Sequence, residues 1–213
     1  MRLGIAALRI VVGTLFMGHG LQKLTGWLGG HGLEATGRLF EKLGLRPGRV
    51  QAATSGVAET TGGALLAAGC LTPAGSSLIS GAMLTAIRKV HWPKGVWVSD
   101  GGYEYNLVLL ATAFAITDAG PCSPSVDAAL GRPRWGRRWA VAQLAAGVIG
   151  SAAAVALGAR QGEETAASSM GAEEERPPAE RAGRDGQQAP AKLHEEVDAA
   201  AEADDGAAAL AGS

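Results

Sequence analysis

Five stretches within the first 160 residues are almost wholly apolar, and each is close to the roughly 20 residues that a bilayer core requires. A soluble helix of this length normally has a charged face, which these stretches lack. The sequence therefore predicts an all-α fold, namely a polytopic membrane four-helix bundle with a fifth helix. The predicted spans are about Leu3 to Leu21, Val50 to Leu71, Ala74 to Val90, Tyr103 to Thr117 and Trp139 to Gly158.

The third and fourth stretches are short enough to suit buried helices of a soluble protein, so their flanks decide the interpretation. All five tryptophans lie at segment ends or in connectors, as expected of an aromatic belt at the lipid headgroups. We therefore expect a multi-pass protein of the cell membrane. The fifth stretch is mostly alanine, which contributes little to insertion, so peripheral docking stays open for it. The basic residues of the connectors do not choose an orientation.

Charge divides the chain into two parts. Residues 1–160 hold 15 Lys or Arg against 7 Asp or Glu, whereas residues 161–213 hold 4 against 13. The tail has too few large apolar residues to offset its ordering entropy, which predicts an acidic disordered tail over 161–213. We expect a membrane core over 1–132 with an amphipathic interfacial helix at about 33–45, then a basic connector and the additional helix over 133–160.

Alternating helix direction sorts the polar residues between two faces. One face should gather a candidate polar pocket of His19, His91, Tyr103, Glu104 and Asn106. Imidazole titrates near neutral pH, so His19 with Glu104 is a candidate for proton exchange or for contact with a quinone. The other face should gather Cys70 and Cys122, which are interpreted either as a redox-responsive pair or as small residues that a membrane tolerates.

Two ionisable residues lie deep in the predicted spans. Arg9 is ten residues, or about 15 Å, from His19, and Glu59 is nine residues from Val50. A charge at such depth normally faces inward and finds a partner, so we predict an intramembrane Arg9–Glu59 ion pair, direct or bridged by water. It could act as a proton or redox site, or as a structural clamp between helices.

Small residues should form the contacts between helices. Glycines at four-residue spacings from other small residues allow close backbone approach in lipid. The predicted packing positions are Gly20, Gly62, Gly63 and Gly81. No HxxxH, ExxH or CxxC spacing occurs among the candidate ligands, so no metal site is predicted. No basic stripe lies free of the apolar segments, and nucleic-acid binding has no support.

Three segments together resemble the DoxX family of small bacterial membrane proteins. They are HGLQKL at the end of the first span, ETTGGALLAAGCLTPAG in the second, and His91 followed by GGYEYNLVLLATAF. The resemblance covers about residues 5–132 and implies a compact four-helix membrane core. It marks Arg9, His19, Gly20, Lys23, Glu59, Gly62, Gly63, His91, Glu104 and Asn106. In GPCSPSVDAALG, Cys122 and Pro124 depart from the family pattern.

The resemblance also implies a loose link to oxidoreduction. Family relatives include a subunit of an archaeal thiosulfate:quinone oxidoreductase and a mycobacterial protein that assembles with a sulfurtransferase and superoxide dismutase. The leading hypothesis is a membrane component of a thiol- or quinone-linked redox system, with quinone as the candidate cofactor and soluble redox proteins and membrane lipid as partners. The alternatives are a non-enzymatic scaffold that recruits soluble proteins and a transporter of a small solute or protons. Whether the chain is an enzyme subunit, and whether it forms an oligomer, stays open.

Overall fold

The computed structural model describes residues 3–132 and 134–174. Every regular element in these residues is helical, so the all-α prediction is confirmed. A compact unit comprises residues 1–163, and a second unit begins at Glu164. The disordered tail was predicted from residue 161, but residues 161–174 are helical, so this boundary was wrong. The rest of the predicted tail, residues 175–213, lies outside the described residues.

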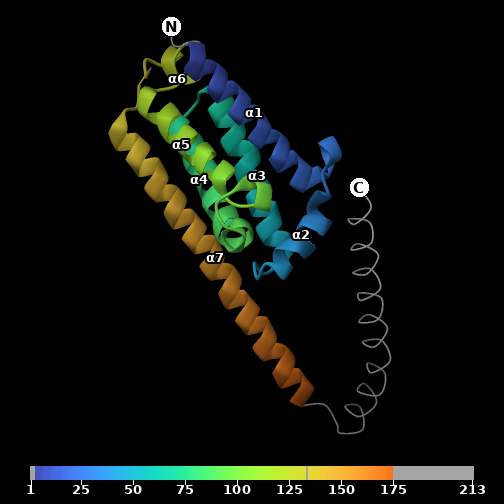
Figure 1. The fold of residues 1–213 in the computed structure, drawn as a ribbon. Helices are drawn as coiled ribbons and strands as arrows, with labels where there is room; N and C mark the ends of the chain where they lie inside the picture. Colours follow the sequence, from blue (N-terminus) through green and yellow to red (C-terminus); the bar gives the residue numbers. More distant parts are fainter. Residues whose placement is uncertain (1–2, 133, 175–213) are drawn as a thin grey trace. The chain divides into compact units, whose positions relative to one another are not determined.

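The long helices of the first unit follow the predicted apolar stretches. They are α1 (Leu3–Thr25), α3 (Gly48–Ala68), α4 (Thr72–Ala86), α5 (Glu104–Ala119) and α7 (Arg137–Glu174). Short helices join them: η1 (Trp27–Gly29), α2 (Gly32–Lys42), η2 (Ile87–His91), η3 (Trp92–Lys94), η4 (Val98–Asp100) and α6 (Val126–Ala129). Figure 1 shows α1, α3, α4 and α5 side by side, with α7 running along them.

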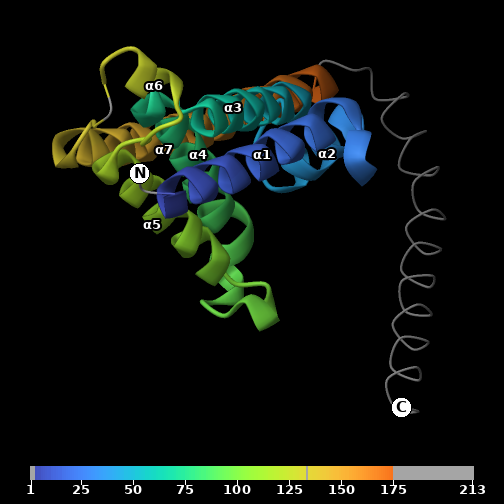
Figure 2. The same cartoon turned by 90° about the horizontal axis from the view of Figure 1, so that it is seen from above.

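Helices α1 and α3 form the most extensive helix contact, and glycine makes it possible. A Cβ atom built on Gly20 would lie 2.1 Å from Thr60 Oγ1, and one on Gly63 would lie 2.4 Å from the Gly13 carbonyl oxygen. These contacts show that the two helices are antiparallel and that α1 lies directly against the α3 backbone (Figure 2). Gly62 serves the α3–α4 contact, where its Cβ would meet Leu78 at 2.9 Å. Gly81 is less constrained, since its Cβ would meet Gly147 at an ordinary 3.5 Å.

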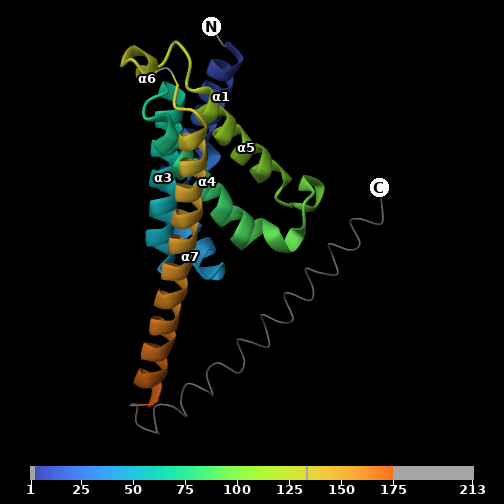
Figure 3. The ribbon, with the colours of Figure 1, turned by 90° about the vertical axis from the view of Figure 1, so that its left-hand side faces the viewer.

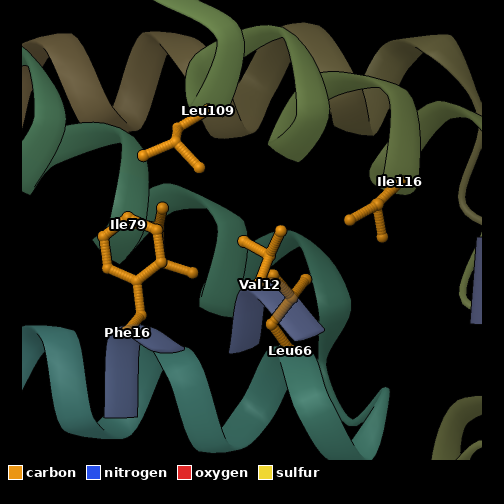
Figure 4. Packing of buried hydrophobic residues seen from close by; sticks show 6 residues of the cluster. All are labelled: Val12, Phe16, Leu66, Ile79, Leu109 and Ile116. Carbon is orange, nitrogen blue, oxygen red and sulfur yellow. The ribbon is translucent and has the colours of Figure 1, made fainter. Parts of the chain in front are cut away.

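An apolar cluster joins four of the long helices. Figure 4 shows Val12, Phe16, Leu66, Ile79, Leu109 and Ile116 converging between α1, α3, α4 and α5. Around this cluster the interior is unusually polar. The buried polar side chains include Arg9, Glu59, Thr72, Ser76, Ser80, Asn106, Thr117, Asp127 and Gln143.

Helix α7 joins the bundle through polar contacts with α4. Ser80 donates a hydrogen bond to Gln143 Oε1 at 3.0 Å, and Thr85 and Ser151 bond through their hydroxyls at 2.9 Å. Gly147 packs against Ser80, whose Cβ would lie 2.7 Å from a Cβ added at that glycine. The fifth helix is therefore packed along the core over residues 140–155.

Two helices of the described residues are long and apolar enough to cross a membrane, namely α1 and residues Arg137–Thr165 of α7. Of the other predicted spans, α3 has 21 residues, α4 has 15 and α5 has 16. Helix α4 continues without interruption into the π-helical turn η2, which extends it to His91. Figure 3 shows the end of α4 and the start of α5 projecting away from α3 and α7.

Candidate functional site

The projecting α4–α5 hairpin leaves a pocket against α1. The pocket has a volume of about 190 Å³, and His19, His91 and Asn106 line it together with apolar residues of α1 and α5. Val12, Phe16 and Leu109 form part of its inner wall and belong to the apolar cluster of the core. The pocket thus combines a hydrophobic floor with three polar side chains.

His91 reaches this pocket from the π-helical turn at the end of α4. Its Nδ1 atom lies 2.6 Å from the carbonyl oxygen of Gly101. A carbonyl oxygen can only accept, so Nδ1 carries the hydrogen and donates it. The neutral ring therefore has its lone pair on Nε2. π-Helical turns occur frequently at functional sites, because the wider turn changes the direction of a side chain.

His19 is fixed in the same tautomer by Gln22. The Gln22 amide nitrogen donates to the Leu28 carbonyl oxygen at 2.9 Å, which fixes the amide's orientation. Gln22 Oε1 then faces His19 Nδ1 at 3.1 Å and accepts its hydrogen. In both histidines Nδ1 is committed to the protein, and Nε2 is the nitrogen left to exchange a proton with a ligand.

Asn106 is the buried polar residue of the pocket. Its amide nitrogen donates to Met83 Sδ at 3.3 Å, and Met83 also lines the pocket. A sulfur atom is a weak acceptor, so this contact leaves Asn106 only modestly satisfied.

The other two predicted pocket residues have different positions. The Tyr103 ring stacks on Trp92, with ring centroids 5.5 Å apart. Glu104 Oε2 accepts a hydrogen bond from the Val98 backbone nitrogen at 2.9 Å. Neither residue lines the pocket, so a direct His19–Glu104 exchange is not supported. Tyr105, which the sequence places on the same face but which was not among the candidate pocket residues, lines the pocket.

The predicted Arg9–Glu59 ion pair does not form among the described residues. Glu59 is 3% exposed, and its Oε1 accepts from Lys23 Nζ and, at 3.2 Å, from Ser55. Its Oε2 has no hydrogen-bond partner. The depth estimate was wrong because it set His19 level with Val50, whereas the neighbouring Gly20 packs against Gly56 and Thr60. Lys23 and not Arg9 therefore contacts Glu59.

Arg9 instead caps the C-terminus of α3. Its guanidinium donates to the carbonyl oxygens of Leu66 and Ala67, and to that of Pro124 at 2.5 Å. The last carbonyls of a helix have no partner within the helix and carry partial negative charge, which a cation stabilises. Arg9 therefore joins α1, α3 and the loop before α6.

Asp127 makes the complementary contact at the start of α4. It accepts hydrogen bonds from the Leu71 and Thr72 backbone nitrogens at 2.8 and 3.0 Å, from Thr72 Oγ1 at 2.7 Å and from Trp135 Nε1 at 2.8 Å. Burial alone would raise its pKa, but the bonds from Thr72, Trp135 and Leu71 outweigh burial and hold the pKa below the ordinary value of 3.8. The α3–α4 turn is thus held between Arg9 and Asp127, which we call the turn clamp.

Sequence reasoning missed the role of Asp127, although a solitary carboxylate beside an apolar segment was a usable signal. Both cysteines flank the same turn clamp, in the α3–α4 turn and in the loop before α6, and both are free thiols. No group of three or more potential metal ligands occurs in the part of the chain that the structure describes.

Part of the chain matches a known protein family. Residues 4–92 match the family model named DoxX. The match contains Arg9, His19, Lys23, Glu59 and His91, whereas Asn106 and Asp127 lie beyond it. No curated protein and no solved structure matches the chain.

The DoxX family is membrane-associated, and the surface of the described residues agrees with a lipid environment. Large apolar side chains point outward along the long helices, including Val11, Leu15, Val57, Val108, Val148 and Ile149. A soluble protein buries such residues and exposes polar ones, whereas a bilayer favours the reverse.

Proposed function

We propose that the chain is a multi-pass membrane component of a redox system and that the pocket between α1 and the α4–α5 hairpin binds a quinone headgroup. The observation that carries the proposal is the combination of two histidines of fixed tautomer with an apolar floor in one pocket. The DoxX domain supports the membrane assignment.

The pocket's size and polarity suit a single substituted ring. A cavity of about 150 Å³ holds benzene in an engineered protein, and this pocket is slightly larger. A quinone has flat apolar faces and oxygen atoms on opposite edges. Phe16 and Leu109 can pack on the ring while the histidines meet the oxygens.

The histidines provide the proton chemistry that a quinone requires. Oxidation of a quinol releases two electrons and two protons. Each neutral Nε2 can accept one proton from a quinol hydroxyl, and each imidazolium can return it to the quinone. The electrons pass to a soluble redox protein in this scheme.

The mouth of the pocket supports a ligand that arrives from lipid. Leu15, Val98 and Tyr105 line the pocket and are each about half exposed or more. A quinone carried in the bilayer would meet this apolar rim before the histidines. The free thiols lie at the other end of the bundle, so the geometry favours quinone over thiol substrates.

Titration of the full chain in lipid nanodiscs with menadione, a short naphthoquinone, tests the proposal by calorimetry. We expect saturable binding, weakened about tenfold in His19→Gln and in His91→Gln, because the removal of one partner of a buried hydrogen bond costs about 1 to 3 kcal/mol. His31→Gln is the matched control, because His31 does not line the pocket.

Two outcomes would overturn the proposal. One is non-saturable partitioning of menadione that equals partitioning into empty nanodiscs. The other is saturable binding that neither histidine substitution changes, which would place the ligand elsewhere on the protein.

A further inference from the structure

A second pocket lies at the opposite end of the bundle, beside the turn clamp. It has a volume of about 540 Å³. Leu71, Pro73 and Ala74 form an apolar wall at the start of α4. The other lining residues are Arg132, Arg134 and Trp135 of the α6–α7 connector and Trp139 in the first turn of α7. This pocket is separate from the histidine pocket and has no role in the proposed quinone chemistry.

The aromatic wall is held rigidly. Trp135 donates its indole hydrogen to buried Asp127, which fixes the orientation of the ring. Trp139 packs against Trp135 edge to face, with ring centroids 5.1 Å apart. The Arg132 guanidinium carbon lies 5.9 Å from the centroid of Trp135, within the range of a cation–π contact. The connector thus presents a preformed surface.

The charge of this pocket is positive. Arg132 and Arg134 both line it and are exposed, and α7 begins with Arg137 and Arg138. The carboxylate nearest to this wall, Asp127, already accepts four hydrogen bonds from the protein. The lining residues of the described chain include no acidic side chain, so the arginines are available to an anion.

The position of the pocket at the start of an apolar span indicates which kind of anion it would meet. The apolar span of α7 begins at Arg137, directly beside the pocket, and Figure 1 shows the start of α1 at the same end. Phospholipid phosphates lie at this level of a membrane helix, and acyl chains begin just below. Leu71 and Trp139 are each half exposed at the pocket, as suits contact with the glycerol and upper acyl region.

We propose that this Arg–Trp pocket binds the headgroup of an anionic phospholipid. Arg132 and Arg134 bind the phosphate, since guanidinium groups match phosphate oxygens in bidentate geometry. Pro73, Ala74 and Trp139 contact the adjoining apolar part of the lipid. Basic pockets between membrane helices are known sites for such headgroups.

Native mass spectrometry of the full chain from nanodiscs of mixed phosphatidylglycerol and phosphatidylcholine provides the test. The wild type should retain phosphatidylglycerol in preference to phosphatidylcholine. We expect the Arg132→Gln/Arg134→Gln protein to lose this preference about tenfold. The matched control is Arg137→Gln/Arg138→Gln, which removes the same charge from the same end but leaves the pocket lining intact.

Each result bears on the proposal. Loss of the preference in the pocket variant alone supports it. An equal loss in both variants indicates diffuse attraction to the membrane surface and overturns it, as does retention in both. Displacement of the lipid by millimolar inorganic phosphate would assign the pocket to a free anion and would also overturn it. Trp139→Leu, which keeps both arginines, should weaken retention without changing the far-UV circular dichroism.

Discussion

Two of the three buried charges among the described residues contact helix ends at short range. Arg9 is 2% exposed and contacts the last carbonyls of α3, while Asp127 is equally buried and contacts the first backbone nitrogens of α4. Depth in the membrane alone would pair Arg9 with Glu59. The backbone dipoles at a helix terminus are an alternative partner for a buried charge, and depth alone does not reveal them.

The stability of the turn clamp should depend on pH through Asp127. Its pKa is lowered on folding, so its carboxylate stabilises the fold fully above about pH 4. That contribution disappears as the pH falls through the lowered pKa. Asp127→Asn should reduce stability at pH 7 by about 2 kcal/mol and flatten the acid dependence.

Thermal unfolding in detergent, followed by circular dichroism between pH 3 and 7, measures this effect. Asp118→Asn is the control, because Asp118 is exposed at the end of α5. The same acid dependence in Asp127→Asn and the wild type would contradict the assignment.

The two ion pairs of the described residues should differ in their effect on stability. Glu59 is almost fully buried beside Lys23, whereas Arg49 and Glu34 pair at a distance of 3.0 Å with both side chains about two-thirds exposed. Lys23→Met leaves a buried carboxylate without a cation and should cost about 3 kcal/mol. Arg49→Met should cost less than about 1 kcal/mol.

Chemical unfolding of both variants checks the contrast. The double variant Lys23→Met/Glu59→Met should be more stable than Lys23→Met alone, because it removes the unpaired charge. Equal losses of stability in Lys23→Met and Arg49→Met would show that the buried pair stabilises the fold no more than the exposed pair does.

At the scale of elements, the helices were predictable and their register was not. Apolar length located α1, α3, α4, α5 and the first part of α7, because lipid-compatible helices need continuous apolar sequence. The register of α1 on α3 depends on where each helix ends. The prediction placed Arg9 opposite Glu59, whereas Arg9 contacts Leu66 and Ala67, about two helical turns further along α3.

Glycine substitution should measure how tightly α1 and α3 fit. In Gly20→Ala the new methyl group would meet the Gly56 carbonyl oxygen and the Thr60 backbone nitrogen, each 2.5 Å away. Backbone atoms cannot move aside without separating the helices, so we expect a loss of about 2 kcal/mol.

Gly150→Ala is the matched control in α7, since nothing lies within 4 Å of its added methyl group. It should raise stability by up to about 1 kcal/mol through higher helix propensity. Thermal melting of both variants in one detergent gives the comparison. A Gly20→Ala protein as stable as the wild type would contradict the close contact between α1 and α3 at Gly20.

At the scale of the whole molecule, the sequence correctly separated two polar ends of the bundle. Helix direction alone brought His19, His91 and Asn106 together and placed both cysteines elsewhere. It could not separate Tyr103 and Glu104 from the pocket. That distinction depends on the fold of the connector at 92–103, where Glu104 bonds to Val98 and Tyr103 stacks on Trp92.

The arrangement also predicts a topology in the membrane. Gly158 packs against Leu45, so the far part of α7 lies at the end where α2 leads into α3. Leu130, which precedes α7, lies at the other end, beside α6. In a Cys70→Ser/Cys122→Ser background, an impermeant maleimide should label Leu130→Cys and Glu163→Cys from opposite sides of the membrane.

Lys42→Cys provides the reference for this experiment, because Lys42 is the last residue of α2 and should label from the same side as Glu163→Cys. Labelling of all three positions from one side would contradict a crossing by α7. Helix α7 would then lie docked at the periphery of the membrane and would not cross it.

The π-helical turn η2 relates the pocket to the length of the chain as well as to its composition. A π-helical turn accommodates one residue more than an α-helical turn. Deletion of one residue within Ile87–Val90 would therefore return the turn to α-helical geometry and leave His91 facing in nearly the same direction. A second deletion would have no extra residue to absorb it, and it would rotate His91 by about 100° about the helix axis. The two histidines would then no longer face one ligand, although every pocket residue would remain in the sequence.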